Sequence, residues 1–396
     1  MRVLYLHLAG AFGGASKSLI ELYEAAKKLG KIEAVTLTPA GTAATAFEKA
    51  GMQVIETTGL SQFDHTRYGY YRHLRWLILM RELLYLPGTF LALLRLRNTQ
   101  AAFDLIHVNE ITLLPTALLA KWVFQLPMVI HVRSVQYLDH TSWRTRQVFK
   151  LLNKIASEVI CIDETVRASV PGWVKTKVIH NGISVDSSMT QAKEQTEIIN
   201  IGMAGVLLRS KGIYEFLQAT NILVNERQRN IHFIIAGENA RNTTGLKQWL
   251  LKRMGFYEDV FAEAIKFVQD NALEKHVTFK GFLPDIRKFY PGMDVICFPS
   301  HLNACGRPVF EAAFFGIPSI VAIKDPLEDA IIHEVTGLAI NDPSPVLLAN
   351  AIDRLALNHD FRMKLGKQAR DWALSHFSIE NSAAQLLDIY FHNLKK

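Results

Sequence analysis

The stretch FPSHLNACGRPVFEAAFFGIPSIV, residues 298–321, decides the fold of the second half of the chain. It follows from the apolar run 294–298, which is typical of a buried parallel strand. Pro308 lies where the first helical position is expected, because its fixed φ suits that place and its missing N–H costs nothing there. Gly316 ends the helix. The pattern therefore predicts a strand, a polar loop, a short helix and a second strand in succession.

The loop between this strand and helix is expected to bind an anion. It lies at the carboxyl end of a parallel strand and at the amino end of a helix, where free backbone N–H groups and the helix dipole face a crevice. Glu311 falls in the first turns of the helix, eight positions after Asn303, so both side chains could reach one ligand. The alternative for Glu311 is an ordinary solvated position on the helix surface.

Composition is that of a globular protein with large cores. A length of 396 residues favours two domains, with 49% hydrophobic and 20% charged residues. The net charge of +7 permits a nucleotide, phospholipid or nucleic-acid partner without selecting one. Three cysteines without metal-ligand spacing suit a reducing cytoplasm. Residues 1–8 fit a strand better than a signal peptide, and no uninterrupted apolar run of about 18 residues predicts a membrane-spanning helix.

Apolar runs alternate with helical patterns, which predicts an α/β fold of parallel sheets covered by helices. The polar stretch 187–196 predicts a linker. We therefore expect a first domain over 1–186, a second over 197–375, and an amphipathic helix over 376–396 that packs back on the first. The expected strands are 3–7, 34–38, 53–56, 105–108, 128–132, 159–162, 177–180, 198–203, 232–236, 276–280, 294–298, 318–322 and 337–340.

Residues 67–97, RYGYYRHLRWLILMRELLYLPGTFLALLRLR, break this alternation. Two helices divided by Pro87 and Gly88 fit best. One interpretation is ordinary core-facing helices with solvated arginines. The other is docking on an anionic membrane surface, because arginines beside aromatic and leucine side chains hold headgroups while the apolar face is buried. The residues proposed for this contact are Arg72, Arg75, Trp76 and Arg81.

Cations are predicted at a second helix start. In AGVLLRSKGIYEFLQA, residues 204–219, Arg209 and Lys211 precede the helix that Gly212 opens, and could bind a diphosphate. The alternative for Lys211 is a solvated lysine in a turn. No D-x-D pair and no cluster with metal-ligand spacing is present, so charge neutralisation is expected from protein cations and dipoles and not from a metal.

Two further segments face the carboxyl edge of the first sheet. His131 and Arg133 occupy alternate positions at a strand end in PMVIHVRS, although a strand histidine can also be a core residue. Gly13 and Gly14 could let a ligand approach the backbone, or simply form a tight turn. Patterns of the kinds GxGxxG, GxSxG, GxxxxGK[ST] and CxxC are absent, which argues against dinucleotide, serine-hydrolase, P-loop and redox sites.

The order and spacing of these segments resemble the GT-B glycosyltransferases of family 4 over nearly the whole chain. The segments that carry the resemblance are GGASKSLIEL near the start, DLIHVN at 104–109, VIHNGI at 178–183, GVLLRSKG at 205–212, IIAGE at 234–238, VTFKGF at 277–282 and the stretch 298–321. The resemblance implies two Rossmann-like domains facing across a cleft. It also implies an acceptor on the first domain, a nucleotide-sugar donor mainly on the second, and transfer with retention at the anomeric carbon without a metal or other cofactor.

The resemblance implies roles for single residues. Glu311 matches the glutamate that binds the donor ribose hydroxyls, Lys211 matches the lysine at the diphosphate, and His131 resembles a histidine that faces the donor sugar. The other residues that it places around the donor are Glu238, Gly281, Phe282, Leu283, Ala304, Cys305, Gly306 and Arg307.

The chain departs from the family pattern at two positions. Asn303 stands where the first of two paired glutamates is usual, and Val206 stands where an arginine usually precedes the lysine, which leaves Arg209 as a substitute.

The expected function is a cytoplasmic, membrane-associating retaining glycosyltransferase with a UDP- or GDP-type donor and a glycan or lipid-linked acceptor, as in envelope polysaccharide or glycolipid assembly, without a nucleic-acid partner. The alternatives are an epimerase or phosphorylase on the same fold, or a nucleotide-sugar binding module without turnover.

Overall fold

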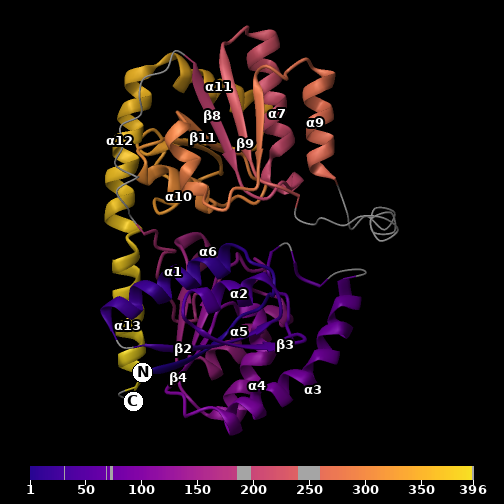
Figure 1. The fold of residues 1–396 in the computed structure, drawn as a ribbon, viewed down its shortest axis with the longest axis vertical. Helices are drawn as coiled ribbons and strands as arrows, with labels where there is room; N and C mark the ends of the chain where they lie inside the picture. Colours follow the sequence, from indigo (N-terminus) through magenta and orange to yellow (C-terminus); the bar gives the residue numbers. More distant parts are fainter. Residues whose placement is uncertain (31, 68, 72–74, 185–197, 240–258, 395–396) are drawn as a thin grey trace. The chain divides into compact units, whose positions relative to one another are not determined.

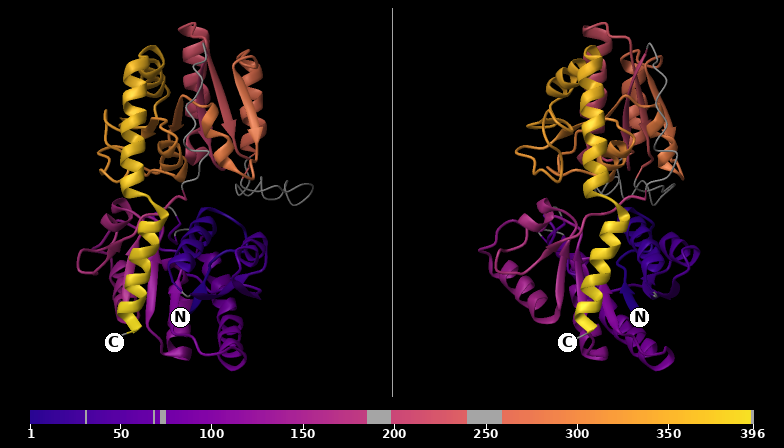
Figure 2. Two further views of the ribbon diagram at one scale, coloured as in Figure 1. Left: turned by 60° about the vertical axis from the view of Figure 1, so that its left-hand side comes forward. Right: turned by 90° about the vertical axis from the view of Figure 1, so that its left-hand side faces the viewer.

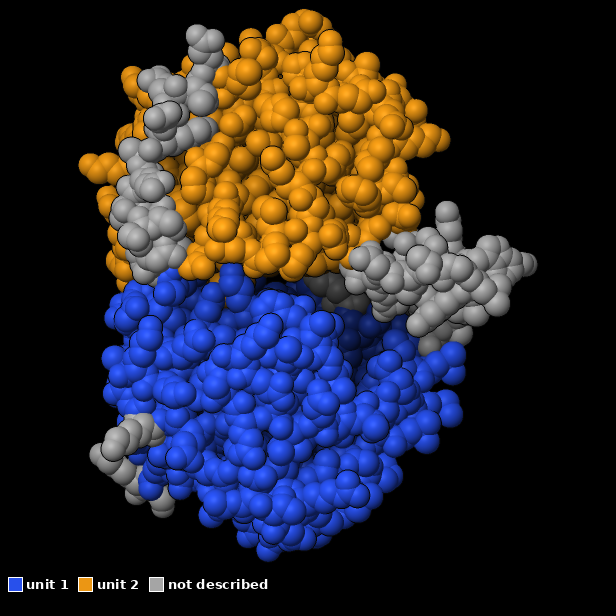
Figure 3. All heavy atoms as spheres, viewed as in Figure 1, with its two compact units in different colours: residues 1–184, 377–396 blue, residues 185–376 orange. Residues whose placement is uncertain are grey.

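The computed structural model describes residues 1–396 except 31, 68, 72–74, 185–197, 240–258 and 395–396. The expected linker and Arg72 lie outside the described residues. The chain forms two compact units, unit 1 with Met1–Ser184 and Phe377–Lys396, and unit 2 with Val185–His376 (Figure 3). Each unit holds one parallel sheet with helices against it, which is an α/β architecture (Figure 1).

Unit 1 is built on a parallel sheet in the order β3-β2-β1-β4-β5-β6-β7. Its strands are β1 (Arg2–Leu6), β2 (Glu33–Pro39), β3 (Gln53–Thr57), β4 (Leu105–Val108), β5 (Met128–Val132), β6 (Glu158–Cys161) and β7 (Lys177–Val178). Its helices are α1 (Gly14–Leu29), α2 (Thr42–Lys49), α3 (Trp76–Thr99), α4 (Leu114–Phe124) after a 3-10 turn at Ile111–Leu113, α5 (Trp143–Ile155), α6 (Glu164–Ala168) and α13 (Ile379–Leu394).

Alternate residues of the unit 1 strands pack into two cores. Leu4 and Leu6 of β1 belong to a core on one face of the sheet, and Val3 and Tyr5 belong to a core on the other face. The second core includes side chains of α1 and of the C-terminal helix α13, which lie against each other in both views of Figure 2. Both faces of the sheet are therefore covered, which explains why its central strands β4 and β5 are buried along their whole length.

Unit 2 has a parallel sheet in the order β10-β9-β8-β11-β12-β13. Its strands are β8 (Ile199–Ala204), β9 (Ile231–Ala236), β10 (Val277–Gly281), β11 (Val295–Phe298), β12 (Ser319–Ala322) and β13 (Gly337–Ile340). Its helices are α7 (Ile213–Asn221), continued by a π turn at Ile222–Glu226, α9 (Val260–Asp270), α10 (Arg307–Phe314), α11 (Pro345–Leu357) and α12 (His359–His376).

The deciding stretch folds as the sequence predicts, with one shift. All four residues of β11 and all four of β12 are buried. Helix α10 begins at Arg307, so Pro308 is its second position and not its first. Gly316 follows the helix with a φ of 71°, the left-handed conformation that terminates helices. All thirteen expected strands are present among the described residues, with ends that differ by a residue or two.

The predicted break at Pro87 and Gly88 is wrong, because α3 continues through Pro87. A proline inside a helix costs roughly 3 kcal/mol through its lost N–H and its clash with the preceding turn. Side chains on both sides of Pro87 bind the segment 61–62 and hold the helix in one piece. Thr89 accepts from the Ser61 N–H at 3.1 Å, and Glu82 Oε2 accepts from the Gln62 N–H at 3.1 Å.

Helix α3 also differs from expectation in its apolar length. Within the described part of the chain, it is the one helix of at least 18 residues that is long and apolar enough to cross a membrane by length and composition, and only 17% of its most apolar window is buried. Arg81 and Glu82 interrupt the apolar run, so a search for uninterrupted runs overlooks it.

Candidate functional site

Two helix starts lie side by side at the carboxyl edge of the unit 2 sheet. The turn Arg209–Lys211 follows β8 and leads into α7, while the loop 301–306 follows the neighbouring strand β11 and leads into α10. The His301 N–H donates to the Ser210 carbonyl at 3.0 Å. Gly212 has a φ of 82°, and a Cβ there would lie 1.9 Å from the Pro299 carbonyl oxygen, so only glycine permits this approach.

Lys211 is the half-buried cation of this edge. Its Nζ lies 5.0 Å from the ring centroid of Phe298, the last residue of β11. Burial lowers the pKa of Lys211, and no carboxylate pairs with it among the described residues. Lys211 is therefore only partly solvated. A nearby anionic ligand would favour its charged form.

Arg209 has different neighbours from Lys211. Its guanidinium lies 4.5 Å from the ring centroid of Tyr214, and its Nη2 lies 3.9 Å from a carboxylate oxygen of Glu263 on α9. Its side chain is 61% exposed. The structure thus places both predicted cations in one turn, with Lys211 against β11 and Arg209 against α7 and α9.

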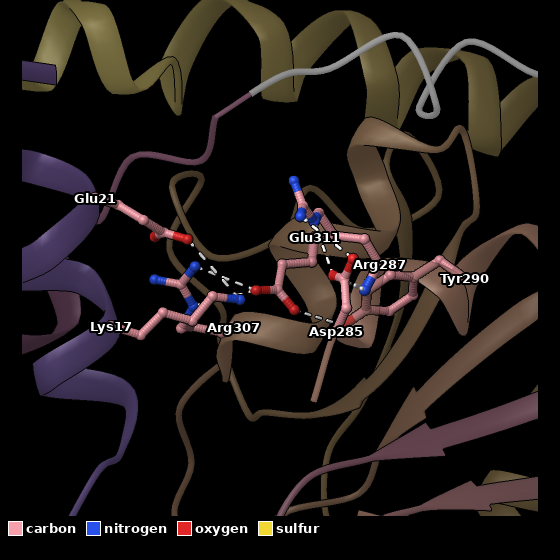
Figure 4. A network of polar contacts seen from close by, with 7 residues as sticks. All are labelled: Lys17, Glu21, Asp285, Arg287, Tyr290, Arg307 and Glu311. Carbon is pink, nitrogen blue, oxygen red and sulfur yellow. Dashed lines mark hydrogen bonds and ion pairs between the residues drawn. The ribbon is translucent and has the colours of Figure 1, made fainter. Parts of the chain in front are cut away.

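Glu311 is buried, so its interpretation as a solvated helix residue is wrong. The Tyr290 hydroxyl donates to its Oε2 at 2.6 Å, and the Arg307 guanidinium donates to its Oε1 at 3.2 Å (Figure 4). Burial, and then the Glu311 charge, raise the pKa of Tyr290 well above its usual value, so the hydroxyl stays a donor. Arg307 is committed to this carboxylate through its side chain, which leaves its backbone as the part predicted to face the donor.

Asn303 is held in a conformation that suits asparagine. Its φ is 48°, in the left-handed region where Asn is enriched. Its Oδ1 accepts from the Lys324 N–H at 2.9 Å. Because the oxygen is oriented by the backbone, the amide NH2 is the part of Asn303 left to donate to a ligand.

The rest of the loop is shaped by packing against β11. A Cβ on Gly306 would lie 2.5 Å from the Phe298 ring, so glycine is required for this contact. The Cys305 thiol donates to the Ala330 carbonyl at 3.4 Å and packs in the same small apolar cluster as Phe298. Ala304, between Asn303 and Cys305 in the chain, is half-buried.

Glu238 and the predicted base-binding loop are brought together. The Phe282 N–H donates to Glu238 Oε1 at 3.3 Å, while the Phe282 ring is 63% exposed. Gly281 has a φ of 64° and Leu283 packs on the apolar cluster around Tyr290. The exposed Phe282 ring offers a flat apolar face of the kind on which a nucleobase stacks.

Unit 1 has a buried polar network at the carboxyl edge of its own sheet, organised by Arg133. Its Nε donates to Asn109 Oδ1 at 2.9 Å, its Nη1 to Asn181 Oδ1 at 2.8 Å, and its Nη2 to His131 Nδ1 at 3.3 Å. A guanidinium only donates, so Nδ1 of His131 accepts and its proton is on Nε2. His131 Nε2 is buried with no hydrogen-bond partner among the described residues.

His131 is therefore a neutral hydrogen-bond donor. Burial, then the Arg133 charge and His107, hold the pKa of His131 well below its usual value. With Nδ1 occupied and the imidazolium disfavoured, this side chain offers an N–H and no base.

The same network reaches α1. Asn109 Nδ2 donates to His7 Nδ1 at 2.9 Å, so His7 carries its proton on Nε2, which lies 3.0 Å from Ser16 Oγ. Burial, and then Arg133, lower the pKa of His7 to about 3. Gly13 caps α1 and Gly14 begins it, and a Cβ on either would meet nothing within 4 Å, so no steric need for glycine is visible there.

Sequence analysis missed His7, Asn109 and Tyr290. His7 and Asn109 follow directly after the last residues of β1 and β4, so their position at strand ends was a usable signal. Tyr290 lies 21 residues before Glu311 in a 3-10 turn, and nothing in the local pattern points to it.

The residues proposed for membrane contact behave differently from one another. Arg75 pairs with Asp64 at 3.6 Å and Arg81 pairs with Glu82, so neither charge is freely available. Trp76 is 48% exposed. Arg133 lies in the buried network described above. Over the described ranges, no group of three His, Cys, Asp or Glu side chains could hold a metal ion.

Family models match both halves of the chain. Residues 12–187 match the model described as Glycosyltransferase Family 4, and residues 186–372 match the model described as Glycosyl transferases group 1. The chain belongs to the GT-B glycosyltransferases of family 4. The resemblance noted in the sequence is thereby confirmed.

Curated relatives are distant members of the same group. The chain is 23% identical over 273 residues to an uncharacterized glycosyltransferase of Methanocaldococcus jannaschii, covering 65% of this chain and 63% of the relative. It is 24% identical to the capsular polysaccharide biosynthesis glycosyltransferase CapM of Staphylococcus aureus, covering 70% and 74%. A D-inositol 3-phosphate glycosyltransferase of Corynebacterium urealyticum is 26% identical, over 48% of this chain and 42% of the relative. The first and third matches thus span less than two thirds of those relatives.

Solved structures confirm the fold of this family 4 chain. Anabaena HepE in complex with UDP superposes with a TM-score of 0.73 at 20% identity, covering 98% of this chain and 99% of that one. A glycosyltransferase from Rickettsia africae superposes with a TM-score of 0.76 at 17% identity, covering 100% and 99%. The fold is therefore GT-B.

Proposed function

We propose that the protein is a retaining glycosyltransferase that transfers a sugar from a UDP- or GDP-type donor to a glycan or lipid-linked acceptor. The observation that carries the proposal is the edge of unit 2 where Lys211, without a carboxylate partner among the described residues, adjoins the starts of α7 and α10. A half-buried ammonium beside two helix amino termini suits a diphosphate. Membership of family 4, and HepE in complex with UDP, support a nucleotide-sugar as that ligand.

In the proposed reaction, the C1–O bond to the diphosphate breaks and its electron pair stays on the phosphate oxygen. The acceptor oxygen forms the new bond to C1 on the same face, and its proton leaves with the diphosphate. Negative charge grows on the phosphate as the bond breaks, so Lys211 and the helix amino termini would stabilise the transition state more than the ground state. His131, as a neutral donor, would bind a sugar hydroxyl and not remove a proton. No step requires a metal.

The base and ribose are assigned to the other residues of the same unit. Tyr290 and Arg307 orient the two oxygens of Glu311, and a carboxylate held in this way is an acceptor suited to ribose hydroxyls. Glu238 and the exposed ring of Phe282 would border the base. Unit 1 is then the proposed acceptor-binding unit. The CapM relative, which is named for capsular polysaccharide biosynthesis, supports polysaccharide assembly as the context.

A panel of nucleotides and nucleotide-sugars, screened by thermal shift, tests the donor assignment. A ligand at 100 times its Kd should stabilise the protein by about 2.7 kcal/mol. We expect UDP or GDP to stabilise, and the matching nucleoside without phosphates to stabilise far less. No stabilisation by any nucleoside diphosphate would contradict the proposal.

A binding module without turnover is the second candidate, since Asn303 replaces a usual glutamate. The left-handed φ and the bond from the Lys324 N–H give Asn303 a local structural reason, so its presence does not require loss of activity. Slow hydrolysis of the donor without acceptor separates the two, because a pure binding module releases no nucleoside diphosphate. Release of free sugar phosphate would instead favour a phosphorylase.

A further inference from the structure

Helix α3 turns its apolar side outward. Leu77, Met80, Leu84 and Leu91 share one face by their spacing of three, four and seven residues, and they are 63%, 62%, 79% and 55% exposed. A helix on the surface of a soluble protein normally shows the opposite arrangement. Contiguous exposed apolar surface of this kind marks a site of interaction.

The inward side of α3 is partly polar and firmly bound. Glu82, Thr89, Leu93 and Leu96 are its buried residues. Glu82 and Thr89 accept the hydrogen bonds from the Gln62 and Ser61 N–H groups described above. In addition, the Ser61 hydroxyl donates to the Glu82 carbonyl at 2.8 Å. The leucines near the C-terminal end of α3 belong to the core of unit 1. The helix therefore stays attached along its length and cannot leave unit 1 to cross a bilayer without exposing these groups.

Aromatic and basic side chains flank the apolar stripe. Trp122 of the neighbouring helix α4 is 67% exposed, and its ring centroid lies 5.6 Å from that of Phe90 on α3. Arg95 follows Leu91 by one turn on the same face, and Arg97 is exposed nearby. Neither arginine pairs with a carboxylate in the part of the chain that the structure describes. Figure 1 shows α3 at the outer side of unit 1 beside α4.

We propose that this face of α3 docks unit 1 on an anionic lipid bilayer, with the helix lying in the interface. At 24 residues and 1.5 Å per residue α3 is about 36 Å long, enough to lay several turns of leucine along the headgroup boundary. Exposed Trp suits that boundary, and the unpaired arginines match anionic headgroups. The proposal rests on unit 1 alone and holds whether or not the protein transfers sugars.

Vesicle co-sedimentation of the full chain tests whether α3 docks on an anionic bilayer. Vesicles of neutral phospholipid with about a third anionic phospholipid should pellet the native protein, and Leu84→Ser with Leu91→Ser should weaken partition about 100-fold. Arg95→Ser with Arg97→Ser should weaken it about 30-fold on anionic vesicles and little on neutral ones. Bound protein should be released by an alkaline carbonate wash, as expected of an interfacial helix.

Matched controls lie in unit 2. Leu357→Ser removes a leucine that is 65% exposed, and Lys364→Ser with Lys367→Ser removes two exposed cations of α12; both should bind as the native protein does. Unchanged binding by the α3 leucine variant, with a native melting curve, would overturn the proposal. A native protein that ignores both vesicle types but forms a dimer broken by Leu84→Ser would also overturn it, in favour of a second copy as the occupant.

Discussion

Replacing Lys211 with Met should slow the enzyme and stabilise the fold at the same time. The substitution keeps an unbranched side chain of similar length and removes the ammonium group, whose Nζ lies 5.0 Å from the Phe298 ring centroid. Loss of a single transition-state donor costs about 10²-fold to 10³-fold in kcat, or roughly 2.7–4 kcal/mol. Binding of a nucleoside without phosphates should barely change, because the ammonium is assigned to the diphosphate.

The stability effect has a definite pH dependence. Burial lowers the pKa of Lys211 below its ordinary value of 10.5 in the folded protein, so the unfolded chain holds the proton more tightly. The free energy of unfolding therefore rises with pH between the two pKa values, and at lower pH the charged lysine destabilises the fold in full. Lys211→Met should raise the free energy of unfolding at pH 7, and its advantage should shrink as the pH approaches 10.

Initial-rate kinetics and urea unfolding at pH 7 and pH 9.5 measure both effects, with Lys367→Met on α12 as an exposed control that should change neither. A Lys211→Met variant with native kcat would refute the role at the leaving group. A variant that is less stable than the native protein at pH 7 would refute the assignment of Lys211 as a half-buried charge without a compensating carboxylate.

Three more predictions test the remaining site residues. Glu311→Ala should lower the free energy of unfolding by about 3 kcal/mol in urea titrations, because it removes a buried carboxylate that accepts hydrogen bonds from both Tyr290 and Arg307. Tyr290→Phe removes one of these bonds and should cost about 1.5 kcal/mol, so equal losses would contradict the shared role of the carboxylate. Asn303→Asp keeps the left-handed backbone and the acceptor oxygen but loses the NH2 group. The kcat/KM for donors with a carboxylate or acetamido group should therefore fall about 5-fold to 150-fold relative to plain hexose donors. An unchanged ratio would contradict the hypothesis that the Asn303 amide selects the donor sugar. Nitrogen-15 NMR should show His131 neutral and protonated on Nε2 from pH 5.5 to 8. Arg133→Met should raise the pKa of His131 and give a mixture of its two tautomers. An imidazolium at pH 6 in the native protein would rule out His131 as a neutral hydrogen-bond donor.

The fold was largely predictable because buried parallel strands are continuous apolar runs in any sequence. The run 105–108 and the run 128–132 give β4 and β5 with their observed limits. The continuity of helix α3 was not predictable, because the local effect of Pro87 is outweighed by hydrogen bonds to residues 61–62, which are distant in sequence. Tertiary contacts of this kind leave no local pattern.

The candidate site was predictable in position more than in chemistry. The sequence placed Glu311 and Lys211 at helix starts on one sheet edge, and the structure shows both there. It could not show that Glu311 is buried under Tyr290, or that the guanidinium of Arg133 fixes the tautomer of His131. The first property depends on side chains 21 residues apart. The second depends on Asn109 and Asn181, distant in sequence, which hold the Arg133 guanidinium in place.

Proton NMR of the reaction shows directly whether the sugar is transferred with retention. The native protein is incubated with each nucleotide-sugar that stabilises it and a panel of glycoside acceptors, and the anomeric proton and the nucleoside diphosphate are followed together. We expect an α-linked donor to give an α-linked glycoside and one nucleoside diphosphate for each sugar transferred, and Lys211→Met to slow this reaction about 10²-fold to 10³-fold. A β-linked product, or a free sugar phosphate in place of the glycoside, would contradict this expectation.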